Sequence, residues 1–329
     1  MSCRAGRKVC GILRPFRRPH EVFPLLKSLS LATVFASVSL LTAQHSPHTT
    51  GLVHTADVDL GYETFGTQGG KALPVIAVNG GPGLSHGYMV MNDIWQKVAM
   101  NRLVVFYDPR GTGASKRLVA NARQDMDAQV ADLEAVRAQL KLEKVALVGD
   151  SFGGLISMAY AVLHPEHVGM LVLSDSAPPA WKDMVHLMPQ TFPDIVQEDE
   201  IEEKKLGADS DAAARAGLHN HLRMIFYSPE KRDEFIAKIG DMGYEPAVGE
   251  AVSKATEKID LAADLARFHF PTLVISGRYD MNVAPLTAWN IAHAIAGAKL
   301  VFFEKSGHLP SFEEPECYQK VLEDFLNSR

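Results

Sequence analysis

Short apolar runs that alternate with helical patterns constrain the fold of this chain more than any other feature. The runs are residues 74–80, 103–108, 145–149, 170–175, 272–277 and 300–304. Strands that are covered on both faces look like this. Between two of the runs, residues 126–140 place Val130, Leu133 and Val136 on one helical face. The alternation predicts an α/β fold with a mostly parallel, doubly wound sheet. Residues 53–66 alternate in polarity and predict one or two antiparallel strands at its start.

Residues 178–266 interrupt this alternation, because they contain no convincing strand pattern. They begin with "APPAW" and continue as helical, charged sequence that includes "QEDEIEEKK". An insertion that leaves the carboxyl edge of a parallel sheet, where ligands bind, predicts a lid over an active site. The alternative is a peripheral helical decoration. We therefore expect a helical lid at 178–266, inserted after the sixth strand, between two parts of the core at 44–177 and 267–329.

The first 43 residues are basic and then apolar. Seven Lys and Arg residues oppose the single acid Glu21 there, and residues 28–43 are uncharged and largely apolar. This order predicts a signal peptide that is cleaved after Ala43, and hence a secreted or periplasmic protein. The apolar block is shorter than the roughly 20 residues of a spanning helix. An uncleaved membrane anchor and a mitochondrial transit peptide are the alternatives.

The charge of the chain excludes one large class of partners. Its formal net charge is −6 at pH 7, and the chain without its basic leader is more acidic still. An acidic surface repels nucleic acid. We expect no nucleic-acid partner, and no membrane contact beyond the possible anchor.

No motif in the sequence calls for a metal or an organic cofactor, so we expect none. An H-E-x-x-H motif is absent. Residues 107–115, "YDPRGTGAS", look like a dinucleotide fingerprint but lack its third glycine. We interpret them as a structural loop that shapes the floor of the pocket.

The stretch "GDSFGG" at 149–154 follows a predicted buried strand and precedes a predicted helix. This is the G-x-S-x-G nucleophile elbow, in which a strained turn exposes the serine. Side chains at Gly149 and Gly153 would collide with the neighbouring strand and helix. Ser151 is therefore the candidate nucleophile, and the helix that starts at Phe152 adds a favourable dipole for an oxyanion. The alternative is a structural serine.

A serine hydroxyl needs a base, and the base needs a carboxylate that fixes its tautomer. His308 in "EKSGHLP" follows the last predicted strand, and Asp280 in "SGRYDMNVAP" lies just past the strand before it. Asp175 in "LVLSDSAP" is the rival carboxylate, one strand earlier. The order Ser151, Asp280, His308 is the one expected of an α/β-hydrolase.

The oxyanion of such a reaction needs hydrogen-bond donors. The loop "NGGPG" at 79–83 follows a predicted strand. The backbone N–H groups of Gly81 and Phe152 are the candidates for the oxyanion hole. The alternative is that residues 79–83 form only a turn.

Several motifs together resemble the proline iminopeptidase family of α/β-hydrolases. They are "NGGPGLSHGYM", "YDPRGTGAS", "GDSFGG", "GRYD" and "SGH", and the resemblance covers roughly residues 52–329. It implies the α/β-hydrolase fold, a triad of Ser151, Asp280 and His308, and an oxyanion hole of Gly81 and Phe152.

The chain departs from this family at two places. Asn79 stands where the family usually has His, at a position that supports the loop. Characterised members bind the substrate's free amino terminus with lid glutamates, often beside tryptophans. In this chain the lid has Trp181 near its start, and Glu198, Glu202 and Glu245 are the candidates for that role.

Three functions remain open from the sequence. The first is an aminopeptidase that removes N-terminal proline or a similar residue from short peptides through an acyl-enzyme. The second is an esterase or lactonase that acts on small-molecule esters with the same triad. The third is a ligand-binding protein that kept the fold without catalysis.

Overall fold

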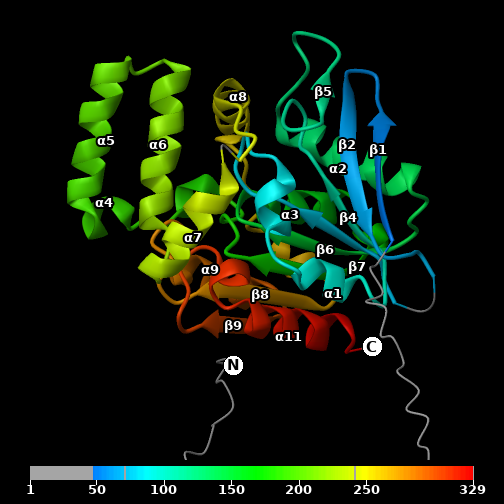
Figure 1. The fold of residues 1–329 in the computed structure, drawn as a ribbon. Coiled ribbons are helices and arrows are strands. Elements are labelled where there is room, and N and C mark those ends of the chain that lie inside the picture. The colour runs from blue at the N-terminus through cyan, green and yellow to red at the C-terminus, as the bar shows by residue number, and fades with distance from the viewer. Residues whose placement is uncertain (1–46, 70–71, 241, 329) are drawn as a thin grey trace, which may run out of the picture. The chain divides into compact units, whose positions relative to one another are not determined.

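A single sheet forms the centre of the structure. The computed structural model describes residues 47–69, 72–240 and 242–328. The strands are β1 (His48–His54), β2 (Val58–Phe65), β3 (Val75–Val78), β4 (Val104–Tyr107), β5 (Lys116–Arg117), β6 (Val145–Asp150), β7 (Val168–Ser174), β8 (Thr272–Gly277) and β9 (Lys299–Phe303). Their order is β1-β2-β4-β3-β6-β7-β8-β9, with β5 paired to β2 (Figure 1). The pairs from β4 to β9 are parallel, whereas β1–β2 and β2–β4 are antiparallel.

Helices cover both faces of this sheet, which explains why its central strands are apolar throughout. Every residue of β3, β4, β6, β7 and β8 is buried. In β3, Ile76 and Val78 belong to one core cluster with α2 (Met126–Gln139), α3 (Phe152–Leu163) and α9 (Pro285–Ala294). Val75 and Ala77 belong to the opposite cluster with α1 (Ile94–Val98) and α11 (Pro315–Leu326). The fold class predicted from the apolar runs is therefore confirmed.

Two strands are not apparent in the sequence because they are exposed. β1 starts at His48, before the predicted range, and most of its residues face solvent at the edge of the sheet. β5 consists of two exposed residues. Neither strand therefore carries the apolar pattern of a buried strand. Because β5 is counted, the insertion that we expected after the sixth strand follows β7.

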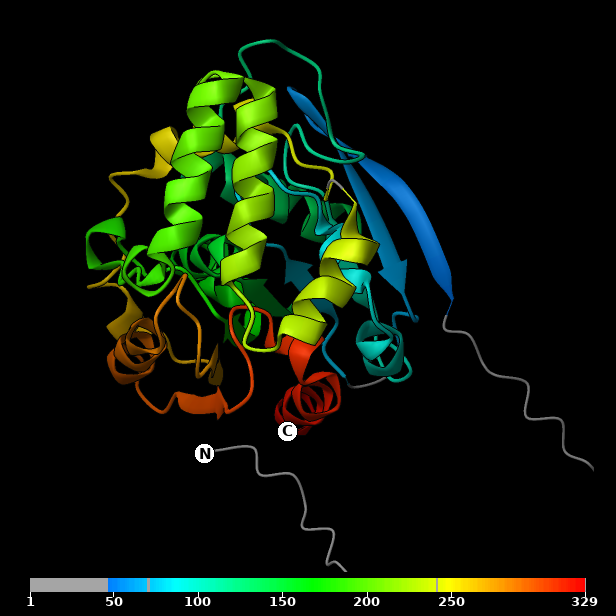
Figure 2. The same ribbon diagram turned by 60° about the vertical axis from the view of Figure 1, so that its left-hand side comes forward.

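The chain between β7 and β8 is helical. Its elements are η3 (Trp181–Asp183), α4 (Met188–Thr191), α5 (Pro193–Leu206), α6 (Asp211–Met224), α7 (Pro229–Ile239), α8 (Pro246–Thr256) and η4 (Leu265–Arg267). Helices α5 and α6 lie side by side (Figures 1 and 2) and are joined by the Glu198–Arg223 ion pair. The β-structure recorded among the described residues of 178–266 is one isolated bridge, Ala180 to Asp260. We refer to residues 178–266 as the lid. The remaining short helices are η1 (His86–Val90), η2 (Pro165–His167) and α10 (Pro310–Glu313).

The predicted signal peptide, residues 1–43, lies outside the described residues. Within the described part of the chain, no helix combines the length and the apolar character that crossing a bilayer requires.

Helix α3 approaches the end of β3 so closely that a side chain does not fit between them. A Cβ atom at Gly153 would lie 2.1 Å from the carbonyl oxygen of Val78 and 2.6 Å from that of Asn79. A Cβ atom at Gly149 would lie 2.5 Å from the carbonyl oxygen of Gly153. Backbone oxygens cannot rotate out of the way as a side chain can. The two glycines therefore let the amino end of α3 pack against the loop that follows β3.

We predict that Gly153→Ala lowers the free energy of unfolding by about 1–3 kcal/mol, the usual cost of overpacking a core position. Urea denaturation measures this change. Gly217→Ala in α6 is the matched control, because its Cβ atom would meet nothing closer than Asp199 Oδ1 at 3.7 Å. Alanine is also the better helix former there. Equal destabilisation by both substitutions would contradict the steric argument.

Candidate active site

Ser151 occupies a strained backbone position between β6 and α3. Its φ is 52° and its ψ is −119°, in a region that non-glycine residues rarely adopt and that costs about 1–3 kcal/mol. Hydrogen bonds hold it there: its N–H donates to Ser174 O at 2.9 Å, and its carbonyl oxygen accepts from Ala177 N at 2.9 Å. The turn brings Oγ to the cavity under the lid, as the nucleophile-elbow interpretation predicts.

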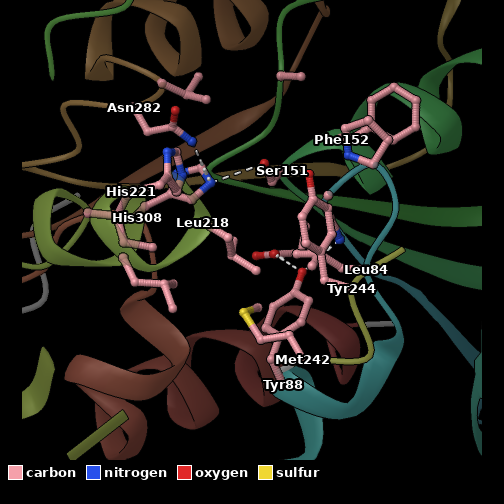
Figure 3. A pocket seen from close by; sticks show the side chains of 18 of the residues that line it. Leu84, Tyr88, Ser151, Phe152, Leu218, His221, Met242, Tyr244, Asn282 and His308 are labelled. Atoms are coloured by element: carbon pink, nitrogen blue, oxygen red, sulfur yellow. Dashed lines mark hydrogen bonds between the residues drawn. The ribbon is translucent and has the colours of Figure 1, made fainter. Parts of the chain in front are cut away.

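The structure brings Ser151, His308 and Asp280 together. His308 Nε2 lies 3.0 Å from Ser151 Oγ (Figure 3), and His308 Nδ1 lies 2.7 Å from Asp280 Oδ2. Asp280 is fully buried, and its Oδ1 accepts the N–H groups of Asn282 and Val283, each at 2.9 Å. Burial alone would lower the pKa of His308, but the charge and hydrogen bond of Asp280 raise it above its ordinary value. The imidazole is therefore oriented and made more basic beside the serine hydroxyl.

Asp175, the rival carboxylate, lies close by but bonds elsewhere. Its carboxylate, that of Asp280 and the His308 ring offer ligand atoms within 4.8 Å of one another. Asp175 Oδ1 accepts the Gly277 N–H at 2.8 Å, and its Oδ2 accepts the Ser174 hydroxyl at 3.1 Å. Burial and the neighbouring charge of Asp280 raise the pKa of Asp175 well above its ordinary value. Asp175 thus joins the ends of β7 and β8, while Asp280 is the carboxylate that His308 contacts.

Two side chains fix the loop that carries the predicted oxyanion donor Gly81. The Tyr88 hydroxyl accepts the N–H of Gly80 at 2.6 Å and donates to Asp150 Oδ2 at 2.5 Å. The Asn79 amide donates to the carbonyl oxygens of Gly80 and Leu84, each at 2.9 Å. Asn79 therefore supports the loop, as expected from its place in the sequence.

Gly81 and Phe152 both line the same cavity as Ser151. Phe152 is the first residue of α3, so its N–H belongs to the positive end of that helix. The two predicted oxyanion donors thus lie in the lining of the cavity that contains Ser151.

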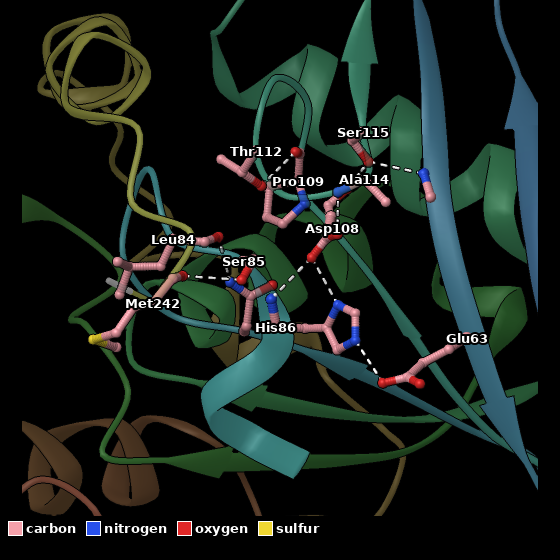
Figure 4. Close-up of polar contacts among 12 residues, drawn as sticks. Glu63, Leu84, Ser85, His86, Asp108, Pro109, Thr112, Ala114, Ser115 and Met242 are labelled. Atoms are coloured by element: carbon pink, nitrogen blue, oxygen red, sulfur yellow. Dashed lines mark hydrogen bonds and ion pairs between the residues drawn. The ribbon is translucent and has the colours of Figure 1, made fainter. Parts of the chain in front are cut away.

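The loop at 107–115 contacts His86, which follows the predicted oxyanion loop, and it does not form the floor of the cavity. Its residues are absent from the described lining of that cavity. Asp108 instead accepts the His86 backbone N–H at 3.0 Å and lies 2.7 Å from His86 Nδ1, while Glu63 lies 2.7 Å from His86 Nε2 (Figure 4). Burial would lower the pKa of His86, but these two carboxylates raise it to about 9. His86 is thus a charged anchor immediately after the oxyanion loop.

The lid is hydrogen-bonded to both sides of the site. On one side, the Ser85 hydroxyl donates to Met242 O at 2.9 Å (Figure 4). On the other side, Glu313 Oε1 accepts the N–H groups of Tyr227 and Ser228, at 2.9 and 2.8 Å, and its Oε2 accepts that of Gly307 at 2.6 Å. Burial raises the pKa of Glu313 to about 7. One carboxylate therefore connects the lid with the loop that carries the base.

A cavity of about 420 Å³ lies between the lid and these loops. Its wall is mostly apolar: Leu84, Phe152, Trp181, Met184, Leu218, Leu222, Ile225, Met242, Val283 and Leu309. Five polar side chains in its lining were not predicted from the sequence: Tyr88, Asp150, His221, Tyr244 and Asn282. Helical spacing in α6 is the signal that could have found His221, which lies three residues after Leu218 and four after Gly217, both in the cavity lining.

The lid glutamates lie away from this cavity. Glu198 Oε2 lies 2.7 Å from Arg223 Nη1, and Glu202 Oε2 lies 3.4 Å from Asn220 Nδ2. Glu245 is exposed at the start of α8. Among the described residues, the cavity lining includes none of these three glutamates. The structure therefore does not place them beside Ser151, because the acidic run lies on exposed surfaces of the lid.

We predict that the ionic anchor makes stability depend on pH. A histidine whose pKa is raised by folding stabilises the native state fully below about pH 6.5, and this contribution is lost as the pH rises through about 9. His86→Gln should therefore cost about 1–3 kcal/mol at pH 6 and progressively less as the pH rises from about 6.5 to about 9. Urea denaturation at several pH values measures it. Parallel stability profiles for the two proteins would contradict the assignment of His86 as a charged group.

Comparisons with known proteins agree with this geometry. The sequence model of the family described as "alpha/beta hydrolase fold" matches residues 74–315. A proline iminopeptidase of Lactobacillus delbrueckii subsp. bulgaricus is 30% identical over 275 residues, which cover 78% of this chain and 90% of that protein. The AB hydrolase superfamily protein YclE of Bacillus subtilis is 28% identical over 287 residues, which cover 84% of this chain and 98% of that protein.

Solved structures show the same fold. An esterase, RhEst1, from Rhodococcus sp. ECU1013 superposes with a TM-score of 0.71 at 19% identity, over 85% of this chain and 98% of that one. A thermophilic esterase from Thermogutta terrifontis superposes with a TM-score of 0.66 at 22% identity, over the same shares. The family match spans strands β3 to β9, the lid, and Ser151, Asp280 and His308, so the chain belongs to the α/β-hydrolase family and is a hydrolase that resembles the proline iminopeptidases.

Proposed function

We propose that this hydrolase cleaves small esters that carry no charged group, and that the reaction passes through an acyl-enzyme on Ser151. Two contacts support this chemistry. Ser151 Oγ lies 3.0 Å from His308 Nε2, and Asp280 Oδ2 lies 2.7 Å from His308 Nδ1. These distances lie within the hydrogen-bond reach that proton transfer requires.

The proposed reaction has two halves with the same proton carrier. Ser151 Oγ attacks the ester carbonyl and gives its proton to His308 Nε2, while the N–H groups of Gly81 and Phe152 stabilise the oxyanion. The tetrahedral intermediate collapses, and His308 gives the proton to the departing alkoxide, which leaves as the alcohol. Water then attacks the acyl-enzyme, its proton passes to His308 and on to Ser151 Oγ, and the carboxylic acid is released. Asp280 stabilises the imidazolium in both halves.

The observation that favours esters is the chemistry of the cavity wall. A substrate with a free amino terminus would bring an ammonium group into a largely apolar cavity, and such a charge is costly to bury without a partner. The lid glutamates that could pair with it lie elsewhere. The cavity does contain Asp150, but its Oδ2 already accepts the Tyr88 hydroxyl. An uncharged ester needs no such partner.

Aminopeptidase activity is the second candidate, and the similarity to curated proline iminopeptidases favours it. Two of them, from Lactobacillus delbrueckii and Heyndrickxia coagulans, are 30% and 27% identical to this chain. On this hypothesis Asp150 is the carboxylate of the described cavity lining that could receive the amine.

We predict that the purified protein hydrolyses p-nitrophenyl acetate and butanoate and reacts with a fluorophosphonate probe at Ser151. Ser151→Ala should abolish labelling and lower kcat by about 10³- to 10⁶-fold, because the nucleophile is lost. Prolyl-naphthylamide, measured with the same preparation, is the competing substrate. Faster turnover of the prolyl amide would favour the aminopeptidase, and an unlabelled, inactive protein would favour the non-catalytic binding protein.

We predict that the two neighbouring carboxylates respond very differently to amide substitution. Asp280→Asn should lower kcat by about 10⁴-fold, because an amide favours the wrong imidazole tautomer. Asp175→Asn is the matched control, and it should lower kcat less than about tenfold, because the amide oxygen can accept the Gly277 N–H and the amide NH2 can donate to the Ser174 hydroxyl oxygen once that hydroxyl turns. Initial rates with p-nitrophenyl butanoate measure both. A larger loss in Asp175→Asn than in Asp280→Asn would reverse the assignment.

A further inference from the structure

We propose that His221 determines specificity by hydrogen-bonding an uncharged polar group in the alcohol part of the ester. The chemical class is a short hydroxyalkyl ester, in which the leaving alcohol carries a second oxygen. This inference rests on the proposed ester hydrolysis at Ser151.

His221 is the polar position on an otherwise apolar helix face. Helix α6 and the residue after it contribute Ala214, Gly217, Leu218, His221, Leu222 and Ile225 to the described lining of the cavity. These positions recur every three or four residues, as one face of a helix does. The imidazole therefore interrupts a face that would otherwise exclude every polar group of a substrate.

The His221 ring has no hydrogen-bond partner among the described residues, whereas two other histidines near the site are fully engaged. His308 contacts Asp280 and Ser151, and His86 contacts Asp108 and Glu63. A neutral imidazole carries one N–H donor and one acceptor nitrogen. Because His221 lines the cavity, a polar group of a ligand that fills the cavity can pair with these atoms. The unpaired ring thus faces the space that the substrate fills.

The position of His221 selects the leaving group over the acyl group. His308 must lie within hydrogen-bond reach of the leaving oxygen to protonate it, while Gly81 and Phe152 hold the carbonyl oxygen. Figure 3 shows His221 beside His308, on the side of Ser151 away from Phe152. His221 and His308 line the same cavity. A group that contacts His221 therefore belongs to the alcohol part of the ester.

The surroundings of His221 keep it neutral, which defines the chemistry it recognises. Burial lowers its pKa to about 4, and the charges of His308 and His186 act in the same direction. Asp150 is the acid in the described cavity lining, and it bonds to Tyr88. Near neutral pH the ring is thus a neutral donor and acceptor, suited to a hydroxyl group.

A matched pair of substrates tests this inference: 2-hydroxyethyl butanoate and propyl butanoate, which differ by a hydroxyl in place of a methyl group. We expect the ratio of their kcat/KM values, hydroxyethyl over propyl, to fall about tenfold in His221→Leu relative to the unmodified protein. A tenfold change corresponds to about 1.4 kcal/mol, within the range of one hydrogen bond. His221→Phe gives the same comparison if leucine lowers the yield of folded protein. His219→Leu, an exposed histidine on the same helix, should leave the ratio unchanged.

The outcomes separate this inference from the function on which it rests. An equal loss of kcat/KM for both esters in His221→Leu, or an equal change of the ratio in His219→Leu, would overturn the role of His221. If neither ester is hydrolysed and Ser151 is not labelled by a fluorophosphonate, the proposed ester hydrolysis fails as well. If both esters are hydrolysed with a ratio that His221→Leu does not change, ester hydrolysis stands and the inference about His221 is wrong.

Discussion

The contact between the first turn of α3 and the end of β3 is the constraint on which the site depends. Gly153 packs directly against the backbone of Val78, and Ser151 is held in a left-handed conformation two residues earlier. This single arrangement places Ser151 and the first residue of α3, Phe152, in the same cavity lining as Gly81. The strain at Ser151 is tolerated because hydrogen bonds from neighbouring strands and loops fix its backbone on both sides.

The fold and the central part of the site could be predicted from the sequence, because both follow from local patterns. Buried parallel strands are apolar at every position, so β3, β4 and β6 are recognisable without their partners. Ser151, Asp280 and His308 lie just beyond strand ends, and parallel strands bring their carboxyl ends to one edge of the sheet. The exposed strands β1 and β5 left no such pattern.

The lid was harder to interpret, because the direction of its side chains depends on packing between helices. Its acidic run suggested a partner for a substrate amine, yet Glu198 and Glu202 contact Arg223 and Asn220 of the neighbouring helix. Conversely, no motif in the sequence distinguishes His221, which lines the cavity, from His219, which is exposed. Helical spacing places the two histidines on different faces of α6. The packing of the lid then determines which of these faces lines the cavity. The candidate glutamates of the lid are exposed, as charged residues usually are, and they do not line the cavity in which a substrate amine would bind.

Glu313 gives the lid a mechanical connection to the chemistry. Its two oxygens hold the backbone of Tyr227 and Ser228 in the lid and of Gly307 next to the base, and the His308 N–H also donates to Ile225 O at 2.7 Å. With these bonds intact, the α6–α7 connection and the imidazole move as one unit. Because these bonds join the α6–α7 connection to the backbone of Gly307 and His308, any displacement of that connection that keeps them intact would also shift His308 relative to Ser151.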